Sequence, residues 1–186
     1  MPTETRERIL QAAFSVLSRN GYENTSVKDI AEEAGVAQGL VHYYFKSKEQ
    51  LVLAVLQMTC EQMKLQRHGI EGEANALAAF EHFKASLREH RDFQSLYVEL
   101  IGVGLHEPEI GAGVLEFVRS DRAYVEAIAR QVLAEREDDP RRAPAMAGAV
   151  EAAILGIIVQ NLVDPDFDAD AAVDALAAMS LASVAG

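Results

Sequence analysis

The chain has 186 residues, of which 49% are apolar and 25% charged, a composition that excludes a disordered or fibrous protein. Its single cysteine, Cys60, excludes an intramolecular disulfide framework and a zinc site built on several cysteines. The first ten residues are charged where a signal peptide would be apolar. Polar residues interrupt the most apolar stretch, residues 143–163. We therefore expect a soluble, cytoplasmic protein with no membrane-spanning segment.

The net charge of −12 is unevenly distributed along the chain. Residues 1–68 hold eight Lys/Arg and eight Asp/Glu, so the remaining residues carry the whole negative charge. Binding to DNA phosphates requires a surface that is not strongly negative. The charge pattern thus confines any contact with nucleic acid to the first third of the chain, without demonstrating one.

Helical periodicity dominates the N-terminal part of the sequence, and strand and hairpin signals are nearly absent. Apolar residues at helical spacing predict a first helix that ends at residues 19–21, where Asn and Gly follow Arg. A second helix begins after Ser26, which forms a capping box with Asp29, and it ends at Gly35. A short third helix is expected at about residues 37–44.

The rest of the chain is predicted to be helical as well. Ser47 and Gln50 form a second capping box, which starts a long fourth helix that ends near Gly69 and Gly72. Turns rich in Gly, Pro and Asp separate five further helices, at roughly residues 74–90, 92–105, 110–136, 145–163 and 168–184. The sequence therefore predicts an all-α fold of about nine helices.

Only Gly35 and Val36 separate the second and third predicted helices, as in a helix-turn-helix. In this motif the second helix lies across the DNA backbone, and the third presents side chains to the major groove. On a helical wheel one arc of about 140° on the third helix holds Gln38, Gly39, His42 and Tyr43. Val41 and Phe45 point elsewhere, which suits residues that anchor the helix.

The chemistry of these side chains suggests how each could contact DNA. Gln38 can pair with adenine or donate to guanine acceptors, and Gly39 lets the helix approach the groove closely. Leu40 is ambiguous, because it could pack inward or contact a thymine methyl group. The full set of expected DNA-binding residues is Thr25, Ser26, Lys28, Gln38, Gly39, Leu40, His42, Tyr43, Lys46 and Lys48. Of these, Ser26, Lys28 and Lys48 are expected on phosphates.

Two segments, TSVKDIAEEAGV at residues 25–36 and YYFKSKEQL at residues 43–51, together with Gly39, closely resemble the DNA-binding signature of the TetR family. The resemblance runs from about residue 6 to residue 56. Two positions depart from it: Ala37 stands where Ser or Thr is usual, and His42 stands where Tyr is usual. The first departure removes a hydroxyl cap and the second bears on one DNA contact.

The resemblance implies a DNA-binding domain at residues 1–47 and a ligand-binding and dimerisation domain at residues 48–186. Proteins of this family are homodimers that bind double-stranded DNA at palindromic operators and release it when a small molecule fills the C-terminal bundle. The resemblance thus implies a transcriptional regulator that acts as a repressor. We expect no cofactor. Repressor and activator are not distinguished by the residues.

The helix expected at residues 145–163 is apolar or small almost all round, so we expect it to be buried on every side. It suits packing against a twofold-related copy, and the candidate interface residues are Ala149, Ala153, Ile157 and Leu176. An ordinary core helix of a monomer is the alternative. Candidates for lining a ligand pocket are Phe83, Tyr97, Leu100, Phe117, Tyr124 and Gln160, for each of which core packing is the alternative.

The sequence supports three alternatives to a ligand-released repressor to different degrees. An enzyme is disfavoured, because the five histidines lack metalloprotease spacing and no glycine-rich phosphate loop is present. A protein-interaction module that retains a helix-turn-helix would suit the acidic chain. A DNA-binding protein without a ligand differs from the regulator only in the absence of ligand-dependent release.

Overall fold

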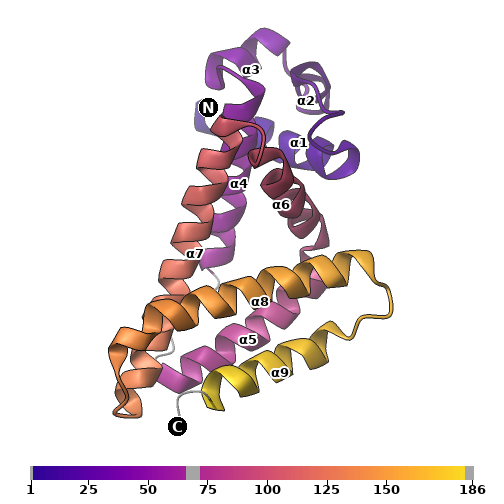
Figure 1. The fold of residues 1–186 in the computed structure, drawn as a ribbon. Helices are drawn as coiled ribbons and strands as arrows, with labels where there is room; N and C mark the ends of the chain where they lie inside the picture. Colours follow the sequence, from indigo (N-terminus) through magenta and orange to yellow (C-terminus); the bar gives the residue numbers. More distant parts are fainter. Residues whose placement is uncertain (1, 66–71, 183–186) are drawn as a thin grey trace. The chain divides into compact units, whose positions relative to one another are not determined.

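The computed structural model describes residues 2–65 and 72–182, and every regular element in this part of the chain is a helix (Figure 1). The α-helices are α1 (Pro2–Asn20), α2 (Val27–Glu33), α3 (Gln38–Tyr44), α4 (Lys48–Leu65), α5 (Gly72–Glu89), α6 (Arg91–Gly104), α7 (Pro108–Glu135), α8 (Ala143–Val163) and α9 (Ala169–Ala182). A short 3-10 helix, η1 (Pro140–Arg142), was not expected. Within the described residues, the predicted all-α class is confirmed. Gly69 and residue 184 lie outside them.

The capping signals read from the sequence start the helices in the structure. Ser26 Oγ accepts from the Asp29 N–H at 3.2 Å and Asp29 Oδ2 accepts from the Ser26 N–H at 2.9 Å, which is a complete capping box for α2. Ser47 Oγ accepts from the Gln50 N–H at 3.1 Å at the start of α4. Asp168 likewise accepts from an N–H in the first turn of α9. Each bond pairs a backbone donor that the helix itself leaves free.

The turn between α2 and α3 depends on Gly35, whose φ of +61° is in the left-handed region that glycine tolerates best. This conformation closes the end of α2, where the Val36 N–H donates to the Ala31 carbonyl at 3.0 Å. Ala37 then begins α3 with no side-chain cap, as its apolar side chain dictates. The short turn makes α2 and α3 a helix-turn-helix.

The chain divides into two compact units. The first comprises residues 1–66 and 92–117, and the second comprises residues 67–91 and 118–186. This division reflects packing within the chain. The division at residues 47 and 48 that the resemblance implies is functional, and it stays a prediction.

In the first unit, α1 packs against α2 and α4, and α2 packs against α3. The residues that are fully buried there include Ile9, Leu17, Ile30, Val41, Leu51, Val52 and Val55. Burial of each such side chain contributes about 1.5–3 kcal/mol before conformational entropy is subtracted. This core holds α3 by one side only.

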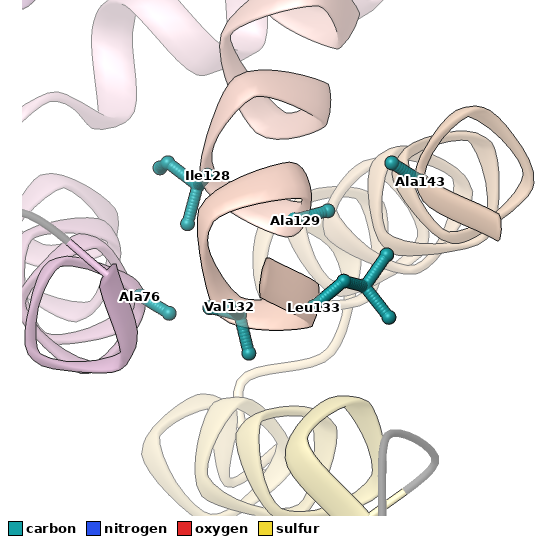
Figure 2. Packing of buried hydrophobic residues seen from close by; sticks show 6 residues of the cluster. All are labelled: Ala76, Ile128, Ala129, Val132, Leu133 and Ala143. Carbon is teal, nitrogen blue, oxygen red and sulfur yellow. The ribbon is translucent and has the colours of Figure 1, made fainter. Parts of the chain in front are cut away.

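In the second unit, α9 packs against both α5 and α8. Figure 2 shows a core in which residues of α7 meet Ala76 of α5 and Ala143 of α8. Two polar contacts also stabilise the packing of this unit. Lys84 of α5 is buried and its ammonium pairs with Asp174 of α9, and Arg91 donates to the Leu162 carbonyl near the end of α8 at 2.8 Å.

Helix α8 is more exposed than its composition predicts. Together with η1, it is long and apolar enough by length and composition to cross a membrane, although polar interruptions were expected to prevent this. Only 17% of its apolar stretch is buried in the single chain, and burial of the rest against a twofold-related copy stays a prediction. The core helix of a soluble protein passes the same test of length and composition. An exposed apolar surface of this kind is typical of a site that binds a partner or another surface.

Candidate nucleic-acid interface

Helix α3 presents one exposed face that is anchored from behind. Val41 and Phe45 are 1% and 5% exposed, so they bind the helix to the core of the first unit. The opposite face is open to solvent and consists of Gln38, Gly39, Leu40, His42 and Tyr43. Four of these residues, all but Leu40, are those expected at a DNA groove. Leu40 lies on the exposed face with 36% of its surface accessible, so it does not pack fully inward.

The exposed face is held in place by aromatic contacts. The rings of Tyr43 and Tyr44 meet edge to face with centroids 5.3 Å apart, and Tyr44 is half-buried. Tyr43 itself is 79% exposed, so its ring and hydroxyl are available to a partner. The guanidinium of Arg6 lies 5.3 Å from the centre of the Phe45 ring at the end of α3. This contact places an arginine of α1 beside the same helix.

The residues expected from α2 differ in how they could meet a phosphate. Lys28 is exposed, and its ammonium lies 3.7 Å from the carboxylate of Glu32 one turn away. Ser26 is exposed but serves as the cap of α2, and its hydroxyl also holds the pKa of Asp29 below the usual range by hydrogen bonding. Thr25 is buried, and its hydroxyl donates to the Gly21 carbonyl at 2.7 Å. Thr25 therefore secures the loop before α2.

Lys46 and Lys48 lie on either side of Ser47, at the junction between α3 and α4. Lys46 is exposed, and Lys48 is half-buried because its ammonium lies 4.1 Å from the centre of the Tyr22 ring. This cation–π contact fixes the lysine at the positive end of α4. The two lysines place positive charge beside the exposed face of α3.

Tyr22 is the residue that joins this junction to α6. Its hydroxyl donates to Glu49 Oε1 at 3.2 Å, and its backbone N–H donates to Glu99 Oε1 at 2.8 Å. Burial, and then the nearby Glu49 carboxylate, raise the pKa of Tyr22 to about 12. The pKa of Glu49 is lowered, mainly by its own backbone N–H and by the Ser47 hydroxyl. The ring of Tyr22 is thereby kept neutral and in place under Lys48.

Three of the candidate ligand-binding residues lie together in the first unit. The rings of Tyr97 and Phe117 meet edge to face, with centroids 4.7 Å apart, and Leu100 is fully buried on the same helix as Tyr97. The ring of Phe93 stacks on Tyr97 with centroids 6.2 Å apart. Sequence reasoning missed Phe93, although it precedes Tyr97 by four residues and therefore shares its face of α6.

The other three ligand candidates belong to the second unit. Phe83 of α5 is half-buried, and Tyr124 of α7 packs against the core cluster of Figure 2. Gln160 of α8 is exposed, and its amide donates to the Gly156 carbonyl of its own helix at 3.3 Å. Its exposure follows from that of α8 as a whole.

The candidate dimer-interface residues divide into two pairs. Ile157 and Leu176 are buried within the single chain, and their place at an interface with a second copy stays a prediction. Ala149 is exposed and Ala153 is half-buried. The exposed apolar residues of these two helices are Ala145, Ala149, Ala152, Val159 and Val163 on α8, and Ala171, Ala175, Ala178, Met179 and Ala182 on α9. We call this set the α8–α9 face.

Sequence reasoning missed Arg6, Tyr22, Glu49 and Glu99 as parts of the interface. The position of Tyr22 directly after a helix-ending glycine was a usable signal for a residue that packs in a turn. No group of three or more His, Cys, Asp or Glu suited to a metal ion occurs in the part of the chain that the structure describes. The interface is thus built from helix termini, aromatic rings and isolated charges.

A helix-turn-helix that exposes one face of its second helix, followed by further helices, defines a DNA-binding regulator of the all-α class. Residues 9–55 match the family model described as bacterial regulatory proteins, tetR family. The match covers 47 of the 186 residues, namely the helix-turn-helix and parts of the helices on either side of it.

The curated relatives match over part of the chain. HTH-type transcriptional regulator UidR of Escherichia coli (strain K12) is 30% identical over 109 residues, which are 58% of this chain and 56% of UidR. Uncharacterized HTH-type transcriptional regulator YvdT of Bacillus subtilis (strain 168) is 42% identical over 78 residues, 38% of this chain and 40% of YvdT. The matches span about half the length of these relatives or less.

Solved structures match along nearly the whole chain. GusR of Salmonella enterica superposes with a TM-score of 0.81 at 22% identity and covers 100% of this chain and 98% of its own. FadR of Bacillus subtilis, solved in complex with stearoyl-CoA, has a TM-score of 0.68 at 22% identity and covers 94% and 97%. These similarities establish the fold beyond the helix-turn-helix.

Proposed function

We propose that this protein is a homodimeric, cytoplasmic transcriptional repressor that binds a palindromic operator and is released from it by a small molecule. The observation that carries the proposal is the exposed face of α3, which is anchored by Val41 and Phe45 and presents groups able to meet base edges. A helix held this firmly from behind can enter a major groove without unfolding. The side chains on its exposed face then determine what it binds.

Phosphate contacts would position the protein on DNA. Lys46 and Lys48 lie beside α3, and Lys28 is exposed on α2. Ser26 adds the N-terminus of α2, whose free N–H groups favour an anion. Neutralising a few phosphates is sufficient for salt-sensitive binding. The net negative charge of the protein does not prevent these contacts, because the first 68 residues are neutral overall.

A second copy of the chain is the partner that the α8–α9 face suits. The face is rich in alanine, so two backbones can approach closely, and Val163 and Met179 are 75% and 64% exposed. A twofold dimer places two copies of α3 for two half-sites, which in helix-turn-helix proteins lie about 34–36 Å apart or a multiple of that distance. A palindromic operator follows from that symmetry.

The proposed effector site in the first unit is the aromatic group of Phe93, Tyr97 and Phe117. Helix α6 carries two of these rings and also Glu99, which bonds to Tyr22. A ligand that displaced α6 would therefore act on the turn next to Lys48. Coupling of about 1–3 kcal/mol is typical of such switches.

The test is binding to sheared genomic DNA from the source organism, titrated with salt, followed by addition of the dialysable fraction of a cell extract. We expect retention of a few fragments, steep loss of binding with salt, and release by the extract. The Tyr43→Ala/Lys48→Ala variant should lose retention while remaining folded by circular dichroism. Arg119→Ala, which removes an exposed charge of α7, is the control and should bind normally.

Absence of retention by folded wild-type dimer at low salt would overturn the DNA-binding proposal. Retention without release would overturn only the effector part, and would leave a ligand-independent DNA-binding protein.

A further inference from the structure

The exposed face of α3 carries no lysine, arginine, aspartate or glutamate. Guanine is read most strongly by a bidentate Arg or Lys, and cytosine by a carboxylate that accepts from its amino group. The groups that α3 offers instead are an amide, an aliphatic side chain, an imidazole and a phenol. The strong contacts that identify a G·C pair are therefore absent from this face.

Gly39 lies between Gln38 and Leu40 on the exposed face, at 100° from each around the helix. A Cβ added to Gly39 would meet no atom within 4 Å, and the backbone of Gly39 does not require glycine. A glycine inside a helix costs about 0.5–1 kcal/mol relative to alanine. Because the fold gives no reason for that cost, close approach of a partner to this point is the reason we assign.

Gln38 and Leu40 flank this point of approach on opposite sides. Their Cα atoms are about 5.4 Å apart in a regular helix, and their side chains diverge by about 200°, so they reach different base pairs. A glutamine amide presents an N–H donor beside its carbonyl acceptor, and this pair matches adenine N7 and N6. Opposite guanine the amide can donate to N7 or O6, but its oxygen finds no donor on that base edge and remains unpaired.

Leu40 has no polar atom in its side chain, so it can gain from a base edge only by apolar contact. The one apolar group at base edges in the major groove is the C5-methyl group of thymine. Leu40 is partly exposed and lies one turn from Tyr43, whose ring is also exposed. Contact with a methyl group would complete the burial of Leu40.

We propose that α3 selects an A·T pair at two positions of each half-site, reading adenine with Gln38 and the methyl group of thymine with Leu40. This inference rests on the proposed DNA-binding function and adds the base preference. His42 and Tyr43 can each form a single hydrogen bond to a base or a phosphate, so they add affinity without replacing either contact.

The test begins with selection of bound sequences from randomised DNA, followed by single-atom changes in the selected half-site. Replacing the contacted thymine by uracil removes only the methyl group and should weaken binding by wild type about three- to fivefold. Replacing the contacted adenine by 7-deazaadenine should weaken it about tenfold. Leu40→Ala should abolish the uracil effect and keep the deaza effect, and Gln38→Ala should do the reverse.

Leu105→Ala is the matched control, because Leu105 is 77% exposed outside α3 and should leave both effects unchanged. Selection of G·C pairs at the two positions, or an equal uracil effect in wild type and Leu40→Ala, would overturn the inference while DNA binding itself persists. Failure to retain any DNA would instead overturn the proposed function, so the two failures are distinguishable.

Discussion

The carboxylate of Glu99 on α6 accepts a hydrogen bond from the backbone N–H of Tyr22, with 2.8 Å between N and Oε1. The bond spans 77 residues of sequence and fastens α6 to the turn between α1 and α2. Tyr22 then carries the connection onward, because its ring underlies Lys48 and its hydroxyl donates to Glu49. One buried residue thus links the helix of the proposed effector site to a lysine expected on DNA.

Glu99→Ala should lower the free energy of unfolding by about 1–3 kcal/mol, because it leaves the partly buried Tyr22 N–H without an acceptor. Glu99→Gln keeps an acceptor oxygen and should lose less. Urea unfolding measures both effects, and operator affinity should fall in the same order. Glu116→Ala, at an exposed carboxylate of α7, is the control. Equal stability of Glu99→Ala and wild type would show that the bond does not hold the turn.

Two glycines should respond in opposite ways to alanine. Gly21 has a φ of +76°, and a Cβ there would lie 2.8 Å from Glu99 Oε1, so Gly21→Ala should destabilise the protein by about 1–3 kcal/mol. Gly39 has open space around it, so Gly39→Ala should leave stability unchanged or raise it by up to about 1 kcal/mol. Thermal unfolding measures both. Operator affinity should fall for Gly39→Ala although its fold is intact, and undiminished affinity would argue against close approach at this residue.

The free energy of unfolding should fall between about pH 10 and pH 12, because Tyr22 has a higher pKa in the folded state than in the unfolded state. Its pKa is about 12 in the folded protein against about 10 unfolded, chiefly because of burial. In this range the unfolded state has lost the proton and the folded state has kept it, so unfolding is favoured as pH rises, by up to about 1.4 kcal/mol per pH unit. Tyr22→Phe should remove this contribution. The difference in tyrosinate absorbance between wild type and Tyr22→Phe should have a midpoint near pH 12, and a midpoint near pH 10 would contradict this.

Substitutions in α8 and α9 should distinguish residues of the core from residues of the proposed dimer interface. Ile157 is buried in the single chain, so Ile157→Ala should cost about 2–5 kcal/mol by leaving a cavity. Val163 and Met179 are exposed, so Val163→Asp/Met179→Asp should leave the chain folded and make it monomeric. Circular dichroism and sedimentation equilibrium distinguish the two outcomes. A dimer that survives the double substitution would place the interface elsewhere.

Signals that act within a few residues were predictable from the sequence. Ser26 and Asp29 cap each other three residues apart, and Gly35 ends its helix by its own backbone conformation. The exposed face of α3 also followed from periodicity alone, because Val41 and Phe45 were the apolar residues available to anchor it. Each of these features depends on neighbours in the sequence.

Features that depend on distant partners were not predictable in the same way. The sequence pattern does not indicate that Tyr22 and Glu99 meet, because 77 residues separate them. The composition of α8 suggested burial on all sides, whereas the single chain buries one side of the helix, with Ala143, Ala147, Ile157 and Ile158. Gln160, a candidate for the ligand pocket, is exposed on the same helix. The residue pattern of a helix that is apolar all round does not show which of its faces is buried.

Sequencing of the genomic fragments bound by wild-type protein and by the monomeric Val163→Asp/Met179→Asp variant tests the central claim most directly. The account predicts inverted repeats in the wild-type fragments, with half-site centres separated by one turn of DNA or a multiple of it, and much weaker retention by the variant. Bound fragments without an inverted repeat, or equal retention by the monomeric variant, would contradict a dimeric regulator that reads a palindromic operator through α3.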